Sequence, residues 1–270
     1  MALRVIYEPR GKALEYGPLA CTIYRGCVHG CKYCYVPAVL RTTHADFNSG
    51  SKPRDEILAK IAHDAHELSG DPRRVFFSFM SDPYQPDEQK FRLTRQALAI
   101  LSQHNVKAKV LTKGGTRACD DFDQMARDGV EFGTTLTSLD DGPRQLWEPG
   151  AAPVADRLDA MRRAFAAGIH VWVSLEPVFD PEQTLAVIRE IRGFVNHVKL
   201  GKINHVPSVD KTVDWRKFLH DARAELSGVD HYIKLDLLKF DDEPRRNVPV
   251  EVVRPVVRRR PMDALWGAPR

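Results

Sequence analysis

The sequence predicts an α/β protein whose strands and helices alternate to form an incomplete (β/α) barrel. Short apolar runs alternate with helical patterns six times between residues 18 and 240, and a seventh apolar run is a further candidate strand. Such alternation is typical of parallel strands joined by crossover helices. No G-x-G-x-x-G follows the first strand, which argues against a dinucleotide-binding sheet. We therefore expect an open (β/α)6-type TIM barrel rather than a closed barrel of eight units.

The size and composition are those of a globular domain. The chain has 270 residues, of which 43% are hydrophobic and 28% charged, so one large domain with a real core is expected. The net charge of +4 permits an anionic partner without requiring one. No signal peptide and no uncharged apolar run of about 18 residues is found, so no membrane partner is expected. Clustered thiols without a disulfide pattern favour the reducing cytoplasm.

Each strand is predicted from a short run of apolar or β-branched residues. The first strand leads into a cysteine-rich loop, and the fourth is rich in threonine. The predicted strands cover residues 18–24, 75–80, 108–112, 130–139, 169–178 and 197–203, with 231–238 as the candidate seventh.

Each helix is predicted where apolar residues recur every three or four positions. Ile57, Ile61 and Ala65 form one such face, with Pro53 in a first-turn position and Gly70 after the end. The predicted helices cover residues 53–68, 91–101, 116–128, 153–167, 181–195 and 215–226.

Three regions are distinguished along the chain: a lead-in over residues 1–17, the partial barrel over 18–240, and a tail over 241–270. Residues 36–52 are predicted to be a loop. Prolines and arginines recur in the tail, including the run Arg258-Arg259-Arg260. The tail is either a solvated extension or an arm that binds anions or nucleic acid, with Trp266 as its one aromatic residue.

Three cysteines lie close together after the first strand. Cys27, Cys31 and Cys34 have the spacing C-x3-C-x2-C, which Cys21 and Cys119 do not extend. Soft thiolates at this spacing select an iron–sulfur cluster or zinc. Three ligands leave one iron of a four-iron cluster open for chemistry. A zinc site would need a fourth ligand such as His29 or His44, because no second cysteine pair is present.

Polar residues follow each predicted strand, where the site of a (β/α) barrel forms. Glu176 lies within an apolar run, where a buried carboxylate needs a partner, so we expect it to belong to the site. In strand order the candidates are Ser81, Asp82 and Tyr84; Lys113; Thr135 and Thr137; Ser174 and Glu176; and Lys199, Lys202 and Asn204.

These motifs resemble the radical S-adenosylmethionine (SAM) enzymes. C-x3-C-x-aromatic-C is the signature of that superfamily, and the run from Tyr24 to Tyr35 resembles its branch related to spore photoproduct lyase. The run from Ser81 to Glu88 with 91–95, and Leu111-Thr112-Lys113, resemble the same branch. The resemblance extends from about residue 24 to about residue 204.

The resemblance implies roles for individual residues. Cys27, Cys31 and Cys34 would bind a [4Fe–4S] cluster, and SAM would bind at its open iron. Ser81 and Asp82 would lie by the amino group of SAM. The carboxylate of SAM would lie by Lys113 and a threonine such as Thr135. Tyr33 would lie beside the adenine, while Tyr35, with Tyr33, matches tyrosines proposed to relay the radical in the lyase. Tyr35 and Glu176 are therefore the candidate catalytic residues.

The resemblance also implies an activity. A one-electron donor such as flavodoxin or ferredoxin would reduce the cluster, and SAM would be cleaved to a 5′-deoxyadenosyl radical that abstracts hydrogen from a substrate. A nucleic acid or nucleotide is one candidate substrate. The lyase has a cysteine where this chain has Phe79, two residues before Ser81, so thymine-dimer repair is not expected. The alternatives are a DNA photoproduct or nucleotide lyase, and a non-enzymatic module that binds nucleic acid through a cluster or zinc.

Overall fold

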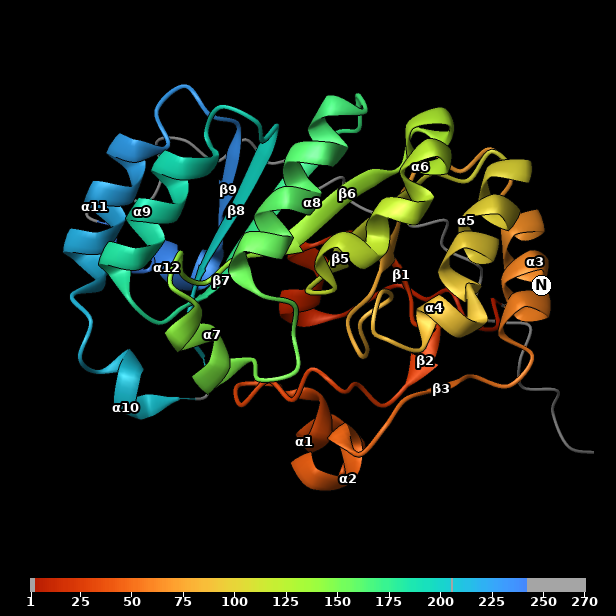
Figure 1. The fold of residues 1–270 in the computed structure, drawn as a ribbon, viewed down its shortest axis with the longest axis horizontal. Helices are drawn as coiled ribbons and strands as arrows, with labels where there is room; N and C mark the ends of the chain where they lie inside the picture. The colour runs from red at the N-terminus through yellow and green to blue at the C-terminus, as the bar shows by residue number, and fades with distance from the viewer. Residues whose placement is uncertain (1–2, 205, 242–270) are drawn as a thin grey trace, which may run out of the picture.

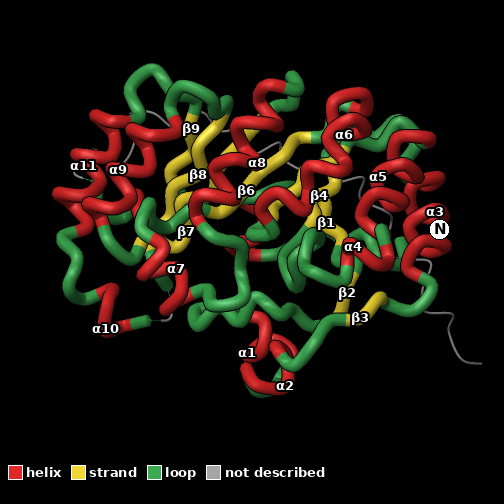
Figure 2. The backbone as a smooth tube through the Cα atoms, viewed as in Figure 1, coloured by secondary structure: helices red, strands yellow, loops and turns green. Residues whose placement is uncertain are grey.

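The computed structural model describes residues 3–204 and 206–241. Within that part of the chain, seven parallel strands form one curved sheet and follow chain order from edge to edge (Figure 2). The strands are β1 (Leu19–Cys21), β4 (Val75–Phe77), β5 (Ala108–Thr112), β6 (Glu131–Thr135), β7 (Val171–Val178), β8 (His197–Lys202) and β9 (His231–Ile233). The predicted partial barrel, including its seventh strand, is confirmed.

Crossover helices cover one face of this sheet. Figure 1 shows these helices side by side in front of the strands. They are α3 (Ile57–Glu67), α5 (Leu93–Gln103), α6 (Phe122–Asp128), α8 (Val154–Ala166), α9 (Pro181–Ile191) and α11 (Trp215–Glu225). Because all the strands are parallel, their carboxyl ends and the loops that follow lie at the same edge.

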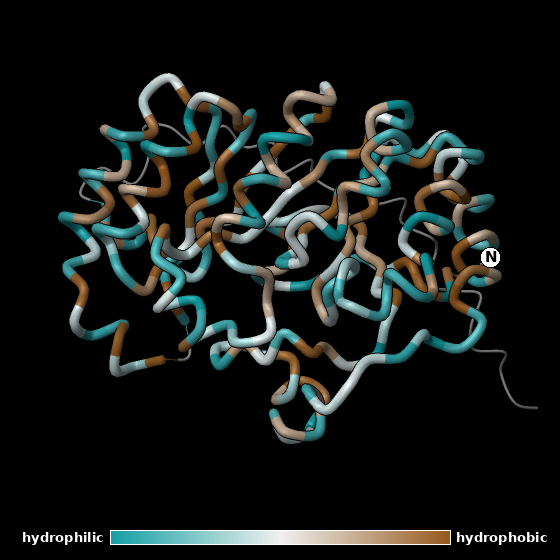
Figure 3. Tube along the Cα trace, in the orientation of Figure 1, coloured by the Kyte–Doolittle hydropathy of each residue, from teal (hydrophilic) through white to brown (hydrophobic). Residues whose placement is uncertain are grey.

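The two faces of the sheet carry different residues. In β4, Val75 and Phe77 belong to the main core under the helices, while Phe76 joins Ala20 and Trp172 in a smaller cluster on the inner face. This follows from the period of two along a strand. Strands that are buried on both faces have continuous apolar runs in the sequence, which explains why such strands could be predicted. Figure 3 shows hydrophobic stretches along the strands.

The segment from 36 to 52 is not the loop that the sequence predicted. It contains the short helices α1 (Val36–Leu40) and α2 (His44–Asn48), followed by β3 (Lys52–Pro53), which pairs with β2 (Tyr24–Arg25). Thr43 caps α2 by accepting from the backbone N–H of Asp46 at 3.0 Å. Helices of five residues are too short to show a periodic pattern, which is why the sequence did not reveal them.

Other element boundaries also differ from the predictions. Pro53 lies in β3 rather than in the first turn of α3, which begins at Ile57. Arg92, with φ of 50°, separates α4 (Glu88–Phe91) from α5. Residues Gly115–Asp121 form a 3-10 helix, η2, before α6, and the run after β9 turns into α12 (Leu235–Leu238). The helices α7 (Asp141–Trp147) and α10 (Pro207–Asp210) were not predicted.

The lead-in region contributes a segment that crosses the inner face of the sheet, which we call the N-terminal strap (residues 7–16). Tyr7 forms an antiparallel bridge with Ala20 at the β1 edge. At the other edge Glu15, at the end of the 3-10 helix η1 (Gly11–Glu15), accepts from Tyr232 Oη at 3.0 Å and from the backbone N–H of Leu235 at 2.9 Å. The strap therefore joins the two open edges of the partial barrel.

The predicted tail falls almost entirely outside the described residues, which end at 241, so its role stays a prediction. Among the helices of the described part, none combines the length and the hydropathy needed to cross a bilayer.

Candidate functional site

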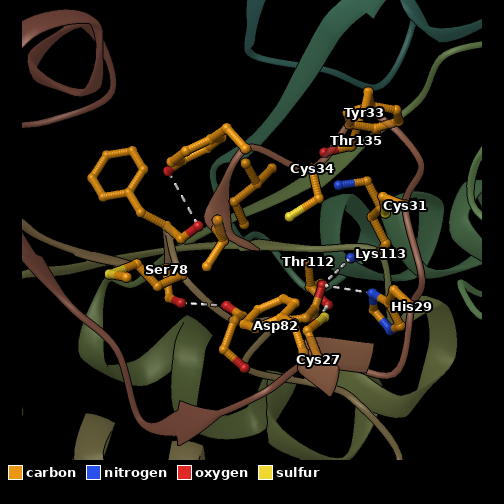
Figure 4. A pocket seen from close by; sticks show the side chains of 17 residues that line it. Cys27, His29, Cys31, Tyr33, Cys34, Ser78, Asp82, Thr112, Lys113 and Thr135 are labelled. Atoms are coloured by element: carbon orange, nitrogen blue, oxygen red, sulfur yellow. Dashed lines mark hydrogen bonds and ion pairs between the residues drawn. The ribbon is translucent and has the colours of Figure 1, made fainter. Parts of the chain in front are cut away.

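A cavity at the carboxyl ends of β1, β4, β5 and β6 collects most of the predicted site residues (Figure 4). The cysteine loop forms one wall, and the segments after β4, β5 and β6 form the others. The predicted residues that line it are Cys27, Cys31, Cys34, Tyr33, Tyr35, Ser81, Asp82, Lys113 and Thr135. Glu176, one of the two candidate catalytic residues, is not among the lining residues.

The three thiols lie in a setting that disfavours free thiolates. Burial raises the pKa of Cys27 to about 11 and that of Cys31 to about 12, and it also raises the pKa of Cys34. Buried thiolates need a positive partner, which a metal centre would supply. All three sulfurs belong to one cavity wall, yet among the described residues no three His, Cys, Asp or Glu side chains are arranged around a single metal-ion position.

His29, the first candidate for a fourth zinc ligand, has both ring nitrogens beside protein groups. Nδ1 lies 3.4 Å from Asp82 Oδ2, and Nε2 lies 3.4 Å from Arg117 Nη2. Burial, with neighbouring cations, lowers the pKa of His29 to about 4, so the ring is neutral at pH 7. Its contacts hold the cysteine loop to the segment after β4.

The segment after β4 positions the cysteine loop rather than presenting free polar groups. Ser81 Oγ donates to the carbonyl of Gly26 at 2.7 Å, directly before Cys27. Gln85 Oε1 accepts from the backbone N–H of Val28 at 3.2 Å, and Gln85 Nε2 donates to Ser81 Oγ at 2.9 Å. Ser81 therefore lines the cavity with its hydroxyl already committed to the loop.

Asp82 is the centre of the contacts between β4 and β5. It accepts from Thr112 Oγ1 at 2.6 Å and from the backbone N–H groups of Lys113 at 2.7 Å and Tyr84 at 2.8 Å. Burial alone would raise the pKa of Asp82. The charge of His29, which is protonated in the acidic range where Asp82 titrates, and the hydrogen bonds from Thr112 and the two backbone groups outweigh burial and lower the pKa below its usual value. Both carboxylate oxygens thus fix the end of β5 beside the cysteines.

Lys113 lines the same cavity as the cysteines, and Figure 4 shows it extending between Cys31 and Cys34. Its ammonium lies 5.7 Å from the centre of the Tyr33 ring. Burial alone would lower the pKa of Lys113, but the negative charges of Cys31 and Glu148 outweigh it and raise the pKa above its usual value. The lysine is therefore charged and oriented into the cavity.

A buried ion pair that the sequence did not reveal supports this wall. Arg157 Nη1 lies 2.6 Å from Glu148 Oε2, and both side chains are almost completely buried. Glu148 also accepts from the hydroxyl of Tyr33, and Arg157 donates to the carbonyl of Thr135 at 3.0 Å. The pair thus fixes two predicted site residues. The sequence feature that could have indicated this ion pair is Arg157, a charged residue on the apolar face of a predicted helix.

The segment after α7 clamps the cysteine loop through its backbone. The carbonyl of Trp147 accepts from Lys32 N at 2.9 Å, and Gly150 N donates to the carbonyl of His29 at 2.9 Å. A Cβ on Gly150 would lie 2.1 Å from the carbonyl oxygen of Val28. Only glycine allows this approach.

Replacing Gly150 with alanine should therefore push the cysteine loop out of place. We expect a loss of about 1–3 kcal/mol in the free energy of unfolding, measured by urea titration, together with lower iron content after reconstitution. Gly193→Ala is the matched control, because nothing lies within 4 Å of its Cβ position. Equal stability and iron content in the two variants would contradict the clamp.

Tyr35 lines the cavity and is partly exposed to solvent. Its hydroxyl donates to the carbonyl of Phe79 at 3.3 Å, and the residue remains 44% exposed. Phe79 also lines the cavity and packs against Phe76, with ring centres 4.5 Å apart and the ring planes tilted by 44°. The side of the cavity that is open to a substrate therefore has aromatic rings rather than a thiol.

Glu176 belongs to a second polar cluster, at the carboxyl ends of β7 and β8 under the N-terminal strap. Lys234 Nζ lies 2.8 Å from each of its carboxylate oxygens, and Tyr16 donates to it. Tyr16 Oη also lies 2.9 Å from Ser174 Oγ, and Lys199 donates to the carbonyl of Glu15. These contacts hold the strap, so the geometry favours a positioning role for Glu176, and its catalytic role stays a prediction.

The remaining strand-end candidates have protein partners of their own. Tyr84 donates to Asp121 at 3.0 Å, Lys202 donates to Asp210 at 2.6 Å, and Asn204 accepts from Lys12 at 3.2 Å. Thr137 is buried. None of these side chains lines the cavity.

Lys199, in the second cluster, should make the stability of the protein depend on pH. Burial, with the charges of Lys109 and Lys234, lowers the pKa of Lys199 to about 7. Between about pH 7 and pH 10.5 the unfolded chain binds a proton at this lysine that the native protein lacks. Over that range the stability should rise with pH by up to about 1.4 kcal/mol per unit through this one group.

The Lys199→Met variant should lack this contribution. We expect the difference in unfolding free energy between wild type and variant to shift in favour of wild type as the pH is raised from 7 to 9, measured by denaturant titration. Comparing the two curves removes the titration of the cysteines, which both proteins share. A difference that does not change with pH would contradict the lowered pKa.

A family model described as the Radical SAM superfamily matches residues 21–195. Among curated sequences, the chain is 25% identical over 176 residues to an uncharacterized protein of Methanocaldococcus jannaschii, covering 64% of this chain and 65% of that protein. It is 28% identical over 167 residues to an uncharacterized protein of Mycobacterium bovis, covering 57% of this chain and 48% of that protein. The chain thus spans less than two thirds of these relatives.

Solved structures share the fold. A spore photoproduct lyase mutant superposes with a TM-score of 0.65 at 15% identity, covering 86% of this chain and 79% of that one. SuiB of Streptococcus suis bound to S-adenosylmethionine superposes with a TM-score of 0.60 at 10% identity, covering 83% of this chain and 52% of that one. With a matching family model over more than half of its length and the same fold, this chain belongs to the radical SAM superfamily.

Proposed function

We propose that this protein is an enzyme that reductively cleaves S-adenosylmethionine and uses the resulting radical on a substrate that is not yet assigned. One observation carries the proposal furthest: the three cysteines share a single cavity with a charged lysine, Lys113, and with the aromatic ring of Tyr33. Family membership is the second support.

The donor set fits an iron–sulfur cluster of the [4Fe–4S] type. In such a cluster each thiolate binds a different iron, and the three cysteines here line one cavity. A single zinc ion would instead need every sulfur ligand to lie about 2.3 Å from the metal. When bound, the cluster and SAM together supply one-electron cleavage to methionine and a 5′-deoxyadenosyl radical.

The chain's own residues would orient SAM and exclude water. Lys113 would pair with the carboxylate of SAM, and its raised pKa keeps it charged for that contact. Tyr33, held by Glu148, and Thr135, held by Arg157, would form the wall beside the nucleoside. Asp82 and Ser81 would act mainly as positioning residues, because protein donors and acceptors already occupy them. The backbone carbonyl of Ser81 already accepts from the hydroxyl of Ser78, so the amino group of SAM would meet the backbone carbonyl of Asp82.

The substrate would enter on the side of Tyr35 and Phe79. Structural neighbours include spore photoproduct lyase in complex with a dinucleoside photoproduct, which makes a nucleic acid or nucleotide one class to test. Phe79 places a ring, not a thiol, on this side of the cavity. We therefore propose that radical generation is shared with the lyase, and that Tyr35 is the residue placed to pass hydrogen to or from a substrate radical.

A reduced cluster requires a one-electron donor, and we propose a carrier of the flavodoxin or ferredoxin class. Clustered cysteines without disulfides fit a reducing compartment such as the cytoplasm.

The test is anaerobic reconstitution followed by reduction with dithionite in the presence of SAM. We expect a brown protein with iron and sulfide in equal amounts that forms 5′-deoxyadenosine. Deuterium transfer from labelled candidate substrates, including dinucleotides, into 5′-deoxyadenosine would then identify the hydrogen donor. A colourless protein with one bound zinc, or a cluster-loaded protein that never cleaves SAM, would overturn the proposal.

A further inference from the structure

Exposed apolar side chains gather on α1, directly after the last cysteine of the loop. Tyr35 is 44% exposed, Val39 61% and Leu40 50%. Figure 1 shows α1 and α2 projecting together from the rest of the molecule, and Figure 3 shows hydrophobic stretches in this projecting part. Nothing in the described part of the chain covers Val39 or Leu40, which therefore face solvent five and six residues from Cys34.

A groove lies beside these side chains and reaches the metal-binding loop. Its volume is about 510 Å³, and Leu40, Thr42 and Lys52 are among the residues that line it. Phe47 lines both this groove and the cysteine cavity, and its carbonyl accepts from the backbone N–H of Cys27 at 3.2 Å. Phe47 therefore borders both the groove and the cavity of the predicted cluster.

The charges around this surface are biased to one sign. Lys32, Arg41 and Lys52 are exposed, and no ion pair is found for any of them among the described residues. Two nearby exposed acids are paired: Asp55 with Arg25 at 3.1 Å and Glu56 with Lys60 at 3.6 Å. Asp46 accepts from the neutral hydroxyl of Thr43 at 2.7 Å and so keeps its charge. Three cations without an ion pair thus outnumber this one carboxylate, and the net charge next to the apolar helix is positive.

We propose that α1 and the adjoining groove are the docking surface for an acidic one-electron carrier protein that reduces the cluster. The inference rests on the proposed function, and it assigns the partner's place on the molecule. One electron would pass from the carrier's reduced flavin or iron–sulfur centre to the cluster, with no bond or proton exchanged. Electron transfer requires close approach, which Phe47 and the cysteine loop allow here.

The chemistry of the surface fits such a carrier. Electron-transfer complexes have small interfaces, and charges on their rims steer association more than they add affinity. A short apolar helix with three uncompensated cations offers both features. An acidic carrier would meet Val39 and Leu40 at the centre and Arg41 and Lys52 at the rim.

The experiment measures 5′-deoxyadenosine formation by the cluster-loaded full chain with two reductants: dithionite, and an acidic flavodoxin kept reduced by its reductase. The Val39→Asp/Leu40→Asp double variant should lose about tenfold or more of the flavodoxin-driven rate and keep the dithionite-driven rate. The Arg41→Glu/Lys52→Glu variant should do the same without touching the apolar centre. Phe165→Asp, which changes an equally exposed apolar residue on α8, should lose neither rate.

Direct binding gives a second readout that does not depend on turnover. Oxidised flavodoxin should bind the cluster-loaded wild type in calorimetry, more weakly as salt is raised, and should not bind either variant. Unchanged flavodoxin-driven rates and binding in both variants would overturn the inference. So would a wild-type dimer that dissociates in the Val39→Asp/Leu40→Asp variant, because the surface would then serve a second copy of the chain.

The outcomes separate the two proposals. If wild type cleaves SAM with dithionite and the variants lose only the flavodoxin-driven reaction, both stand. If dithionite drives no cleavage by the wild type, the proposed function fails and the docking inference fails with it. If the variants lose the same fraction of the dithionite-driven rate and of the flavodoxin-driven rate, α1 serves to hold the cluster and the docking inference alone fails.

Discussion

Replacing Cys31 with alanine is expected to abolish both the bound cluster and the cleavage of SAM. Cys31 lines the cavity together with the other two loop cysteines. Burial raises the pKa of its thiol to about 12, so the thiolate form needs the positive charge of the proposed cluster. A cluster with two remaining thiolates has an exposed second iron and should be lost on gel filtration. Iron, sulfide and 5′-deoxyadenosine should all fall to background.

The control uses a cysteine outside the loop. Cys119 packs on the edge of the core, and the structure gives it no place in the cavity. Cys119→Ser should retain iron, colour and activity. Full cluster content in Cys31→Ala, or its loss in Cys119→Ser, would show that the metal ligands have been misassigned.

Replacing Lys113 with methionine is expected to weaken SAM binding by about 10- to 100-fold, because a charge-assisted hydrogen bond in a buried site contributes about 1.5–3 kcal/mol. The cluster should remain, since Lys113 is not one of its ligands. Equilibrium binding of SAM to the reconstituted protein, followed by the change in the electron paramagnetic resonance spectrum of the reduced cluster, measures the effect.

Lys113→Arg separates charge from shape. It keeps the positive charge and should bind SAM more tightly than Lys113→Met while remaining weaker than wild type, because the guanidinium is larger than the ammonium. Equal SAM affinity in the methionine variant and wild type would remove the lysine from the proposed carboxylate contact.

The sequence was sufficient for those parts of the molecule whose signals are local. The strands β1, β4 and β7 are buried on both faces and therefore contain apolar runs, which indicated their positions. The cysteine spacing and the rule that sites form at the carboxyl ends of strands placed Asp82 and Lys113 on the same cavity.

Features that depend on distant partners could not be predicted. Glu148 meets the Tyr33 hydroxyl across 115 residues of chain, and nothing near either residue indicates the pairing. Gly150 looks like an ordinary loop glycine until the carbonyl of Val28 is seen beside it. For Glu176, the apolar context correctly indicated that the carboxylate needs a partner. It could not indicate that the partner is Lys234, outside the cavity.

The N-terminal strap has a consequence for how the molecule is assembled. Its contacts at the far edge join residues 184 to 224 positions apart, among them Lys199 with Glu15 and Lys12 with Asp236. During translation these contacts can form only after nearly the whole barrel has been synthesised. The contacts of the cysteine loop can form earlier, once Gly150 and Arg157 have been synthesised. Contacts of such high sequence separation form late. A nascent chain would therefore complete the walls of its metal pocket while the seam between its first and last strands is still open.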